Sequence, residues 1–164
     1  MAEFYKLLGD LPKEAEYQQM ALKWLEAVTE ILWHEEDGVW FDYDLMNDKK
    51  RDYFYPSNVA PLLTSCYDRD DETEIVRGVL KYLQKTNVMV NYGGIPASLE
   101  HSGEQWDYPN AWPPLQYLMI FGLDKVNDTF AKELAYEISE RWVRSNFKGF
   151  KETHAMFEKV QNLY

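Results

Sequence analysis

Apolar residues recur at helical spacing in five segments of the chain. In residues 12–33 they follow the spacing i, i+4, i+7, i+8 and i+11 from Tyr17, which predicts an amphipathic helix with one buried stripe. The other predicted helices run from after Ser57 to near Asp68, over about 71–86, from Pro113 to Gly122, and from about Asn127 to the neighbourhood of Phe147. The chain is therefore predicted to be all-α.

The connections between these predicted helices alternate between long and short. The long ones cover about 34–56 and 87–112, and the short ones about 68–71 and 123–127. Helices joined by short links run antiparallel, so both long connections are expected to emerge at one end of an α/α-hairpin array. In the first of them, alternation after Gly38 predicts a short strand or hairpin. This organisation favours an arc of about five to six helices with long functional loops at one end.

Composition and charge argue against several classes of function. The chain has 164 residues, enough for one domain with a buried core, and its 28 acidic and 17 basic residues give a formal net charge of −11. This balance argues against binding to nucleic acid or to an anionic membrane surface, because basic patches bind phosphate groups. No stretch approaches the roughly 20 apolar residues of a membrane span, and the first residues lack the pattern of a signal peptide, so the compartment stays open.

Cysteine, histidine and glycine give no sign of a metal or cofactor site. Cys66 is the single cysteine, which excludes an internal disulfide bond and a cysteine-based metal site. The histidines are scattered, and no carboxylate stands at metal-ligand spacing from them, so we expect no metal. The Gly93-Gly94 pair lacks the spacing of a nucleotide-binding loop, and we expect no cofactor.

The segment Gln105–Pro114 concentrates aromatic and polar side chains that can bind a ligand. It holds two Trp, one Tyr and three Pro beside amide and carboxylate side chains. Sugars are bound by this mixture, because aromatic rings stack on the apolar faces of pyranoses while planar polar groups bond to hydroxyls. The same rings can instead belong to the core, and the amides can satisfy backbone groups of a buried loop. The candidate sugar contacts are Trp40, Gln105, Trp106, Tyr108, Asn110 and Trp112.

Asp107 is the candidate for catalysis. Glycoside hydrolysis needs two carboxylic acids, one that donates a proton and one that stays ionised. Among the acidic residues of the long connections, Asp107 stands between Trp106 and Tyr108, so it is best placed to be partly desolvated and to have a shifted pKa. The alternative is that its carboxylate caps the helix after Pro113 or orders the proline-rich turn by accepting hydrogen bonds from backbone N–H groups.

The triplet Asn127-Asp128-Thr129 fits the pattern of an N-glycosylation acceptor, which would matter only if the chain is secreted. The competing interpretation is that Asn127 caps the last predicted helix, since asparagine is among the preferred N-cap residues. The sequence favours the cap.

The segment Gln105–Pro114 closely resembles the second signature motif of the α,α-trehalases. Further segments resemble blocks of the same family, namely Gly38–Leu45, Phe54–Asn58 with Pro61-Leu62, Tyr92–Leu99 and Ala155–Lys159. The resemblance implies an (α/α)6 toroid, of which this chain would form a part. It also implies a glycoside hydrolase that splits α,α-trehalose into two glucose molecules with inversion and without a cofactor.

Two catalytic motifs of that family do not occur in the chain. The resemblance implies a general acid in an upstream Glu-Ser-Gly-Trp-Asp motif and a general base in a Gly-rich run after the Phe-Glu-Lys segment, whereas Trp106-Asp107 is the only Trp-Asp pair here. Residues 1–164 therefore resemble a single partial toroid domain from the C-terminal half of a catalytic domain. We expect little or no hydrolysis from them alone.

The expected ligand is trehalose or a related glucoside. Two other functions stay open, namely a sugar-binding fragment without catalysis and a helical fragment that binds a protein. An open arc leaves the apolar faces of its first and last helices uncovered, which favours self-association or a complementing chain at the edges of the toroid. No nucleic acid and no metal partner is expected.

Overall fold

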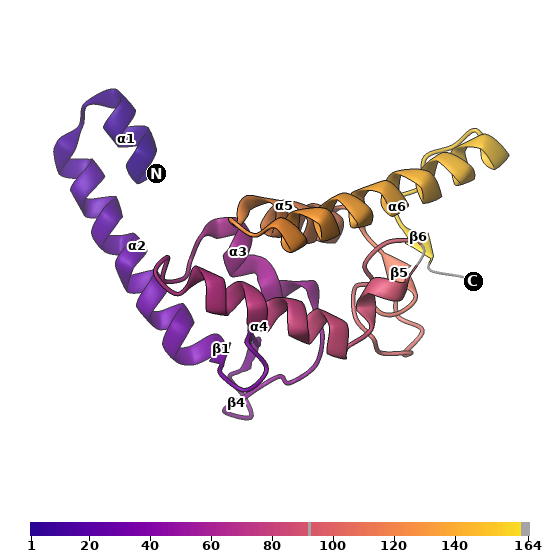
Figure 1. Cartoon of the computed structure of the whole chain (residues 1–164), viewed down its shortest axis with the longest axis horizontal. Helices are drawn as coiled ribbons and strands as arrows, with labels where there is room; N and C mark the ends of the chain where they lie inside the picture. Colours follow the sequence, from indigo (N-terminus) through magenta and orange to yellow (C-terminus); the bar gives the residue numbers. More distant parts are fainter. Residues whose placement is uncertain (92, 162–164) are drawn as a thin grey trace.

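The computed structural model describes residues 1–91 and 93–161 and is mostly helical (Figure 1). The helices are α1 (Ala2–Leu8), α2 (Leu11–Leu32), α3 (Ala60–Thr64), α4 (Glu72–Lys85), α5 (Pro113–Lys125) and α6 (Thr129–Thr153), with 3₁₀ helices η1 (Pro56–Val59) and η2 (Val88–Val90). The short strands pair antiparallel as β1 (Trp33–His34) with β2 (Val39–Trp40), β3 (Tyr43–Asp44) with β4 (Lys49–Lys50), and β5 (Asn110–Ala111) with β6 (Val160–Gln161). The prediction of an all-α fold is confirmed.

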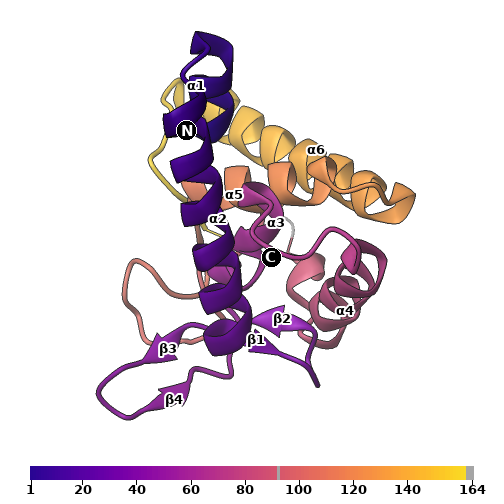
Figure 2. The same cartoon turned by 90° about the vertical axis from the view of Figure 1, so that its left-hand side faces the viewer.

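Helix α5 lies at the centre of the fold and packs against both α3 and α6. Because α6 follows α5 after a link of only three residues, 126–128, and packs back along it, the two form the predicted α/α hairpin. Figure 1 shows α4 beside this group, while α1 and most of α2 extend away from it at one end and the last turns of α6 at the other. In Figure 2 the β1–β2 and β3–β4 hairpins lie at the foot of α2.

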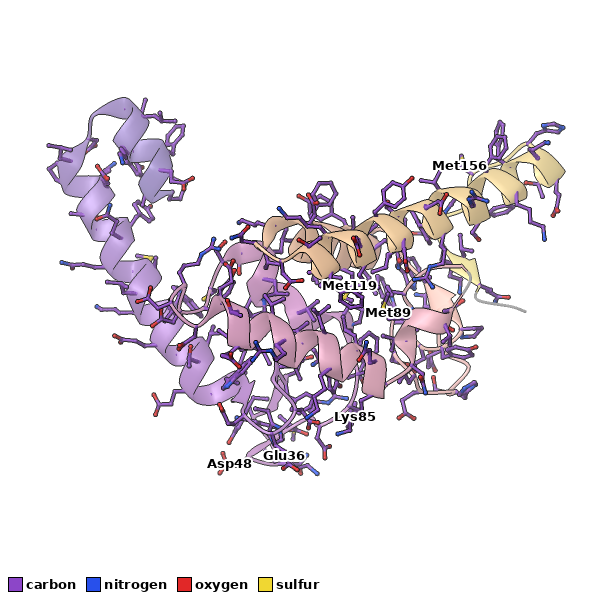
Figure 3. The ribbon with its side chains drawn as sticks, viewed as in Figure 1. Glu36, Asp48, Lys85, Met89, Met119 and Met156 are labelled. Atoms are coloured by element: carbon purple, nitrogen blue, oxygen red, sulfur yellow. The ribbon has the colours of Figure 1, made fainter. Side chains whose placement is uncertain are left out.

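The core lies where α3, α4, α5 and the first half of α6 meet the β1–β2 hairpin. The predicted apolar face of α4 is part of it, because Val79 and Leu83 are fully buried. Met119 of α5 is also fully buried, and Figure 3 shows it between the helices, whereas Glu36 and Lys85 lie at the outer edge. The long connections therefore rest on the core on one side and reach the surface on the other.

Helix α2 forms as predicted, but the prediction that its apolar stripe is buried is wrong. No residue of α2 is buried, and Trp24 keeps 65% of its surface exposed and Ile31 46%. The reason is that α2 packs mainly against α1 and the β1–β2 hairpin that follows it, and only its last turns, with Val28 and Leu32, lie against the core. Periodicity identified the apolar face of this helix but not what covers it.

Helix α1 was not predicted, because seven residues give too few positions to reveal a helical period. Its turn into α2 has local causes. Gly9 ends α1 in the left-handed conformation with φ 73°, and the carboxylate of Asp10 caps α2 by accepting a hydrogen bond from the Lys13 N–H (3.2 Å). The ring of Tyr5 then stacks on Tyr17, with centroids 5.3 Å apart.

The helix predicted between Ser57 and Asp68 is shorter than expected. Ser57 does not cap it but lies inside η1, where its Oγ donates a hydrogen bond to the carboxylate of Asp42 (3.0 Å). Helix α3 ends at Thr64 because Ser65 turns into the left-handed region with φ 58°. The Asp42–Ser57 bond ties the first long connection to the helix that it leads into.

The last helix is capped by Asp128, so the prediction that Asn127 is the cap is wrong. The carboxylate of Asp128 accepts a hydrogen bond from the N–H of Ala131 (2.8 Å). The helix before it, α5, continues past Gly122 as far as Lys125. The link between the two helices is therefore shorter than the sequence predicts.

Glu72 joins three parts of the fold at the start of α4. Its Oε2 accepts hydrogen bonds from the hydroxyl of Tyr67 (2.6 Å) and the guanidinium of Arg69 (2.5 Å), and its Oε1 accepts one from the backbone N–H of Asn127 (3.0 Å). The hydrogen bond from Tyr67, then those from Asn127 and Arg69, hold the pKa of the Glu72 carboxyl below its usual 4.5. The carboxylate thus links the α3–α4 and α5–α6 turns.

We expect Glu72→Gln to lower the melting temperature at pH 7 but to make it less dependent on pH. A carboxyl group whose pKa is lower in the folded than in the unfolded chain stabilises the fold above its usual pKa of 4.5 and loses this contribution as the pH falls through the folded value. The difference in melting temperature between the parent and the variant should therefore narrow as the pH falls from 7 to 3. Glu74→Gln, which breaks an exposed ion pair with Arg77, is the matched control and should unfold like the parent at both pH values. A constant gap between the parent and Glu72→Gln from pH 7 to pH 3 would contradict the assignment.

Candidate functional site

The second long connection is held in place by two side chains from the helices behind it. Gln116 of α5 is 1% exposed, and its amide donates to the carbonyl of Ile95 (2.7 Å) and accepts from the N–H of the same residue (2.8 Å). Arg141 of α6 donates to the carbonyl oxygens of Met89 and Asn91. These bonds satisfy backbone groups of a loop and fix the first part of the connection that leads to the segment Gln105–Pro114.

Asp107 organises the candidate segment through its carboxylate. It accepts hydrogen bonds from the hydroxyls of Ser98 (2.6 Å) and Ser102, and its backbone carbonyl accepts one from the N–H of Asn110 (2.9 Å). The two serine hydroxyls hold the pKa of this carboxyl below its usual range, outweighing the opposite effect of burial. Asp107 is therefore ionised at neutral pH, and it does not cap α5, whose N-cap residue is Trp112.

Trp106 and Trp112 form a stacked pair at the surface of this segment. Their ring centroids are 4.1 Å apart with an interplanar angle of 7°. Trp106 is 48% exposed, whereas Trp112 is 5% exposed and donates its Nε1–H to the carbonyl of Gln105 (2.9 Å). The buried ring thus supports the exposed one, which leaves the outer face of Trp106 open to solvent.

The polar candidates divide into buried and exposed ones. Asn110 is 5% exposed and donates from its Nδ2 to the carbonyl of Asp107 (3.1 Å), while its Oδ1 has no hydrogen-bond donor within residues 1–91 and 93–161. The side chain of Gln105 is exposed, and Tyr108 is half-buried with its ring 4.4 Å from that of His101. The buried Oδ1 is unusual, because buried acceptors nearly always have a partner.

Trp40 does not lie at this surface, which corrects its prediction as a sugar contact. The side chain is 2% exposed and its ring packs at 4.7 Å from Trp33 and 6.3 Å from Tyr67. It belongs to the core beneath the β1–β2 hairpin. The sequence shows an aromatic residue in a long loop there but not that the loop folds back onto the core.

A cluster of three residues in the first long connection was not predicted as part of the site, and one of them, Tyr55, lies near the candidate segment. Arg51 donates hydrogen bonds to the hydroxyls of Tyr53 (3.0 Å) and Tyr55 (3.2 Å), and its guanidinium lies over both rings. Burial raises the pKa of the Tyr55 hydroxyl, the guanidinium of Arg51 acts in the opposite direction, and the negative charges of Asp107 and Glu100 add to the rise. Tyr55 of the first long connection therefore lies near Asp107 and Glu100 of the second, and Figure 2 shows the two connections on the same side of the molecule. The only feature of the sequence that could have indicated this cluster is the spacing of an arginine and two tyrosines at alternate positions.

Other kinds of site find little support in the part of the chain that the structure describes. No cluster of three or more His, Cys, Asp or Glu side chains is arranged for a metal ion there. None of the described helices is both long and apolar enough to cross a membrane. A cavity of about 600 Å³ opens between the end of α2 and α4, but its lining, which includes Trp33 and Arg77, contains no residue of the candidate segment.

The chain matches trehalases along almost its whole length. The family model described as Trehalase covers residues 1–162. Trehalase of Apis mellifera is 58% identical over 159 residues, which are 97% of this chain and 25% of that protein. Trehalase of Homo sapiens is 40% identical over 159 residues, which are 97% of this chain and 27% of that protein. The chain therefore spans about a quarter of the length of these relatives.

The fold agrees with this match. Neutral trehalase Nth1 from Saccharomyces cerevisiae superposes on 98% of this chain and 31% of its own with a TM-score of 0.79, at 23% sequence identity. This likeness confirms the predicted fold, part of an α/α toroid. With its sequence matched from residue 1 to 162, the chain belongs to the trehalase family.

Proposed function

We propose that this chain forms one wall of the substrate site in the catalytic domain of an α,α-trehalase. Residues 1–164 are then a single partial toroid domain, the ligand is trehalose, and the reaction of the whole protein is hydrolysis to two glucose molecules without a cofactor. The observation that carries the proposal is the exposed ring of Trp106 beside the ionised carboxylate of Asp107 in a chain of the trehalase family.

The residues of this wall offer complementary contacts to a glucose unit. The outer face of Trp106 suits stacking on a pyranose, because Trp112 holds the ring from behind. The carboxylate of Asp107 already accepts hydrogen bonds from two serine hydroxyls, and it can accept them from sugar hydroxyls in the same way. Asn110 would accept one through its unpartnered Oδ1, and because this atom is buried the contact requires a shift of the loop. The remaining proposed contacts are Gln105 and Tyr108.

Hydrolysis needs a proton donor as well as an ionised carboxylate. Asp107 suits the second role only, because its lowered pKa keeps it ionised. We therefore propose that a carboxylic acid from another part of a full-length trehalase supplies the proton, and that this chain alone hydrolyses trehalose at background level. Glucose release by the purified chain that disappears in Asp107→Asn would contradict this and make Asp107 the catalytic residue.

Trp106→Ala is expected to weaken trehalose binding by the chain by up to about tenfold, because ring stacking contributes about 0.5–1.5 kcal/mol and 1.4 kcal/mol corresponds to a factor of ten. Calorimetric titration with trehalose, and with maltose for comparison, measures the effect. Trp24→Ala is the matched control, since Trp24 is also exposed but lies on α2, outside the candidate segment. Equal losses in the two variants, or no binding to the parent chain, would overturn the assignment of the sugar surface.

A second candidate function is protein binding through the ends of the arc. Helix α2 exposes Leu22, Trp24 and Ile31, and α6 exposes Val143 and Phe147. Exposed apolar faces of this kind mark interaction surfaces. We expect the purified chain to self-associate through them in sedimentation experiments, and to do so less in Trp24→Ala. A monodisperse monomer at all concentrations tested would count against this function.

A further inference from the structure

The link between α5 and α6 contains the only Asn-x-Ser/Thr triplet of the sequence, Asn127-Asp128-Thr129. The two interpretations of this triplet differ in what the Asn127 side chain does. In the structure Asp128 caps α6, and Asn127 contributes only its backbone N–H, which donates to the carboxylate of Glu72 (3.0 Å). The fold therefore leaves the side-chain amide of Asn127 without a structural role.

The surroundings of Asn127 leave room for a large group. The residue is exposed, and no hydrogen bond of its side-chain amide occurs among residues 1–91 and 93–161. Thr129 is exposed as well, at the first position of α6. A substituent on the Asn127 side chain would therefore break no hydrogen bond and displace no buried atom.

Asn127 also lies far from the candidate sugar surface. The segment Gln105–Pro114 leads into the first turn of α5, whereas Asn127 follows its last turn. Thirteen helical residues at 1.5 Å each separate the two ends by about 20 Å. Figure 1 shows the α5–α6 link and the loops before α5 at different ends of the array. A group attached at Asn127 would leave Trp106 and Asp107 accessible.

We infer that Asn127 is an N-glycosylation site, used when the chain is made in the secretory pathway. Its Nδ2 forms a bond to the anomeric carbon of an oligosaccharide, and the bond from that carbon to the pyrophosphate of a lipid carrier breaks. One proton of the amide is released, and the lipid pyrophosphate leaves. The hydroxyl of Thr129 completes the acceptor pattern. This inference is independent of the proposed trehalose site.

The test is to direct the chain into the secretory pathway of a eukaryotic cell with a cleavable leader and to treat the product with a peptide N-glycosidase. We expect one step in electrophoretic mobility, and a peptide whose residue 127 is deamidated after treatment. Asn127→Gln and Thr129→Ala should both lack the step, whereas Thr129→Ser, which keeps the hydroxyl, should retain it.

Because the sequence holds a single acceptor triplet, each outcome of this experiment either supports or contradicts glycosylation at Asn127. A secreted parent chain without the step would overturn it, and so would a step that persists in Asn127→Gln. Asp128→Ala tests whether glycosylation depends on the N-cap of α6. It removes the hydrogen bond to Ala131 and should lower stability, but it should keep the glycan, because the pattern accepts any middle residue except proline.

Discussion

Gln116→Leu is expected to lower the free energy of unfolding by about 2–6 kcal/mol, because two buried backbone groups lose their hydrogen-bond partner and each such loss costs about 1–3 kcal/mol. Leucine has nearly the same volume as glutamine, so the change leaves little cavity. It removes instead the bonds to the N–H (2.8 Å) and the carbonyl (2.7 Å) of Ile95, a residue that is itself 1% exposed. Urea unfolding of the purified chain measures the difference.

The same substitution should also disturb the candidate sugar surface. Ile95 lies at the start of the loop that carries Ser98 and Ser102, the partners of Asp107. At denaturant concentrations where the variant stays folded, trehalose binding should therefore be weaker than in the parent. Gln105→Leu is the matched control for stability, because this glutamine is exposed and surface substitutions usually change the free energy of unfolding by less than about 0.5 kcal/mol. An equally small change in Gln116→Leu would show that the loop finds other partners for Ile95.

The periodicity of the sequence predicted where the longer helices lie but not whether their apolar faces are covered. Helices α4, α5 and α6 occur where they were expected, and Val79 and Leu83 are buried as the pattern indicates. In α2 the same kind of pattern is present, yet Trp24 stays exposed. Periodicity reports which side of a helix is apolar, whereas burial depends on which elements lie against that side.

The candidate site was predictable in part, because residue type and loop position identified the segment but not its internal contacts. Trp106 and Trp112 were both proposed as sugar contacts, and only their stacking shows which ring faces solvent. The pKa of Asp107 depends on Ser98 and Ser102, which lie nine and five positions before it. Tertiary contacts of this kind leave no local signal in a sequence.

The position of the β1–β2 hairpin against α4 depends on two glycines. Gly38 has φ 69°, and the missing side chain of Gly78 lets the two backbones touch. A Cβ atom added at Gly78 would lie 2.9 Å from the Cα of Gly38, closer than such atoms approach in folded proteins, and a tight 3.1 Å from its carbonyl oxygen. The burial of Val39 and Trp40 in the core holds the hairpin against this helix, and the ion pair between Lys85 and Asp37 (2.7 Å) adds a surface contact between the two.

Gly78→Ala is therefore expected to lower the free energy of unfolding by about 2 kcal/mol, because a clash with backbone atoms costs about 3 kcal/mol, the upper end of the usual range for overpacking, and the better helix propensity of alanine offsets about 1 kcal/mol of it. Gly149→Ala is the matched control inside α6, where the added Cβ would meet Phe157 at an ordinary 3.9 Å. Here the helix propensity acts alone and should raise stability by about 1 kcal/mol. Urea unfolding of both variants should thus separate them by about 3 kcal/mol in opposite directions from the parent. If Gly78→Ala were also stabilising, the hairpin would have to be free to shift, and the tight contact with Gly38 would not be what positions the first long connection.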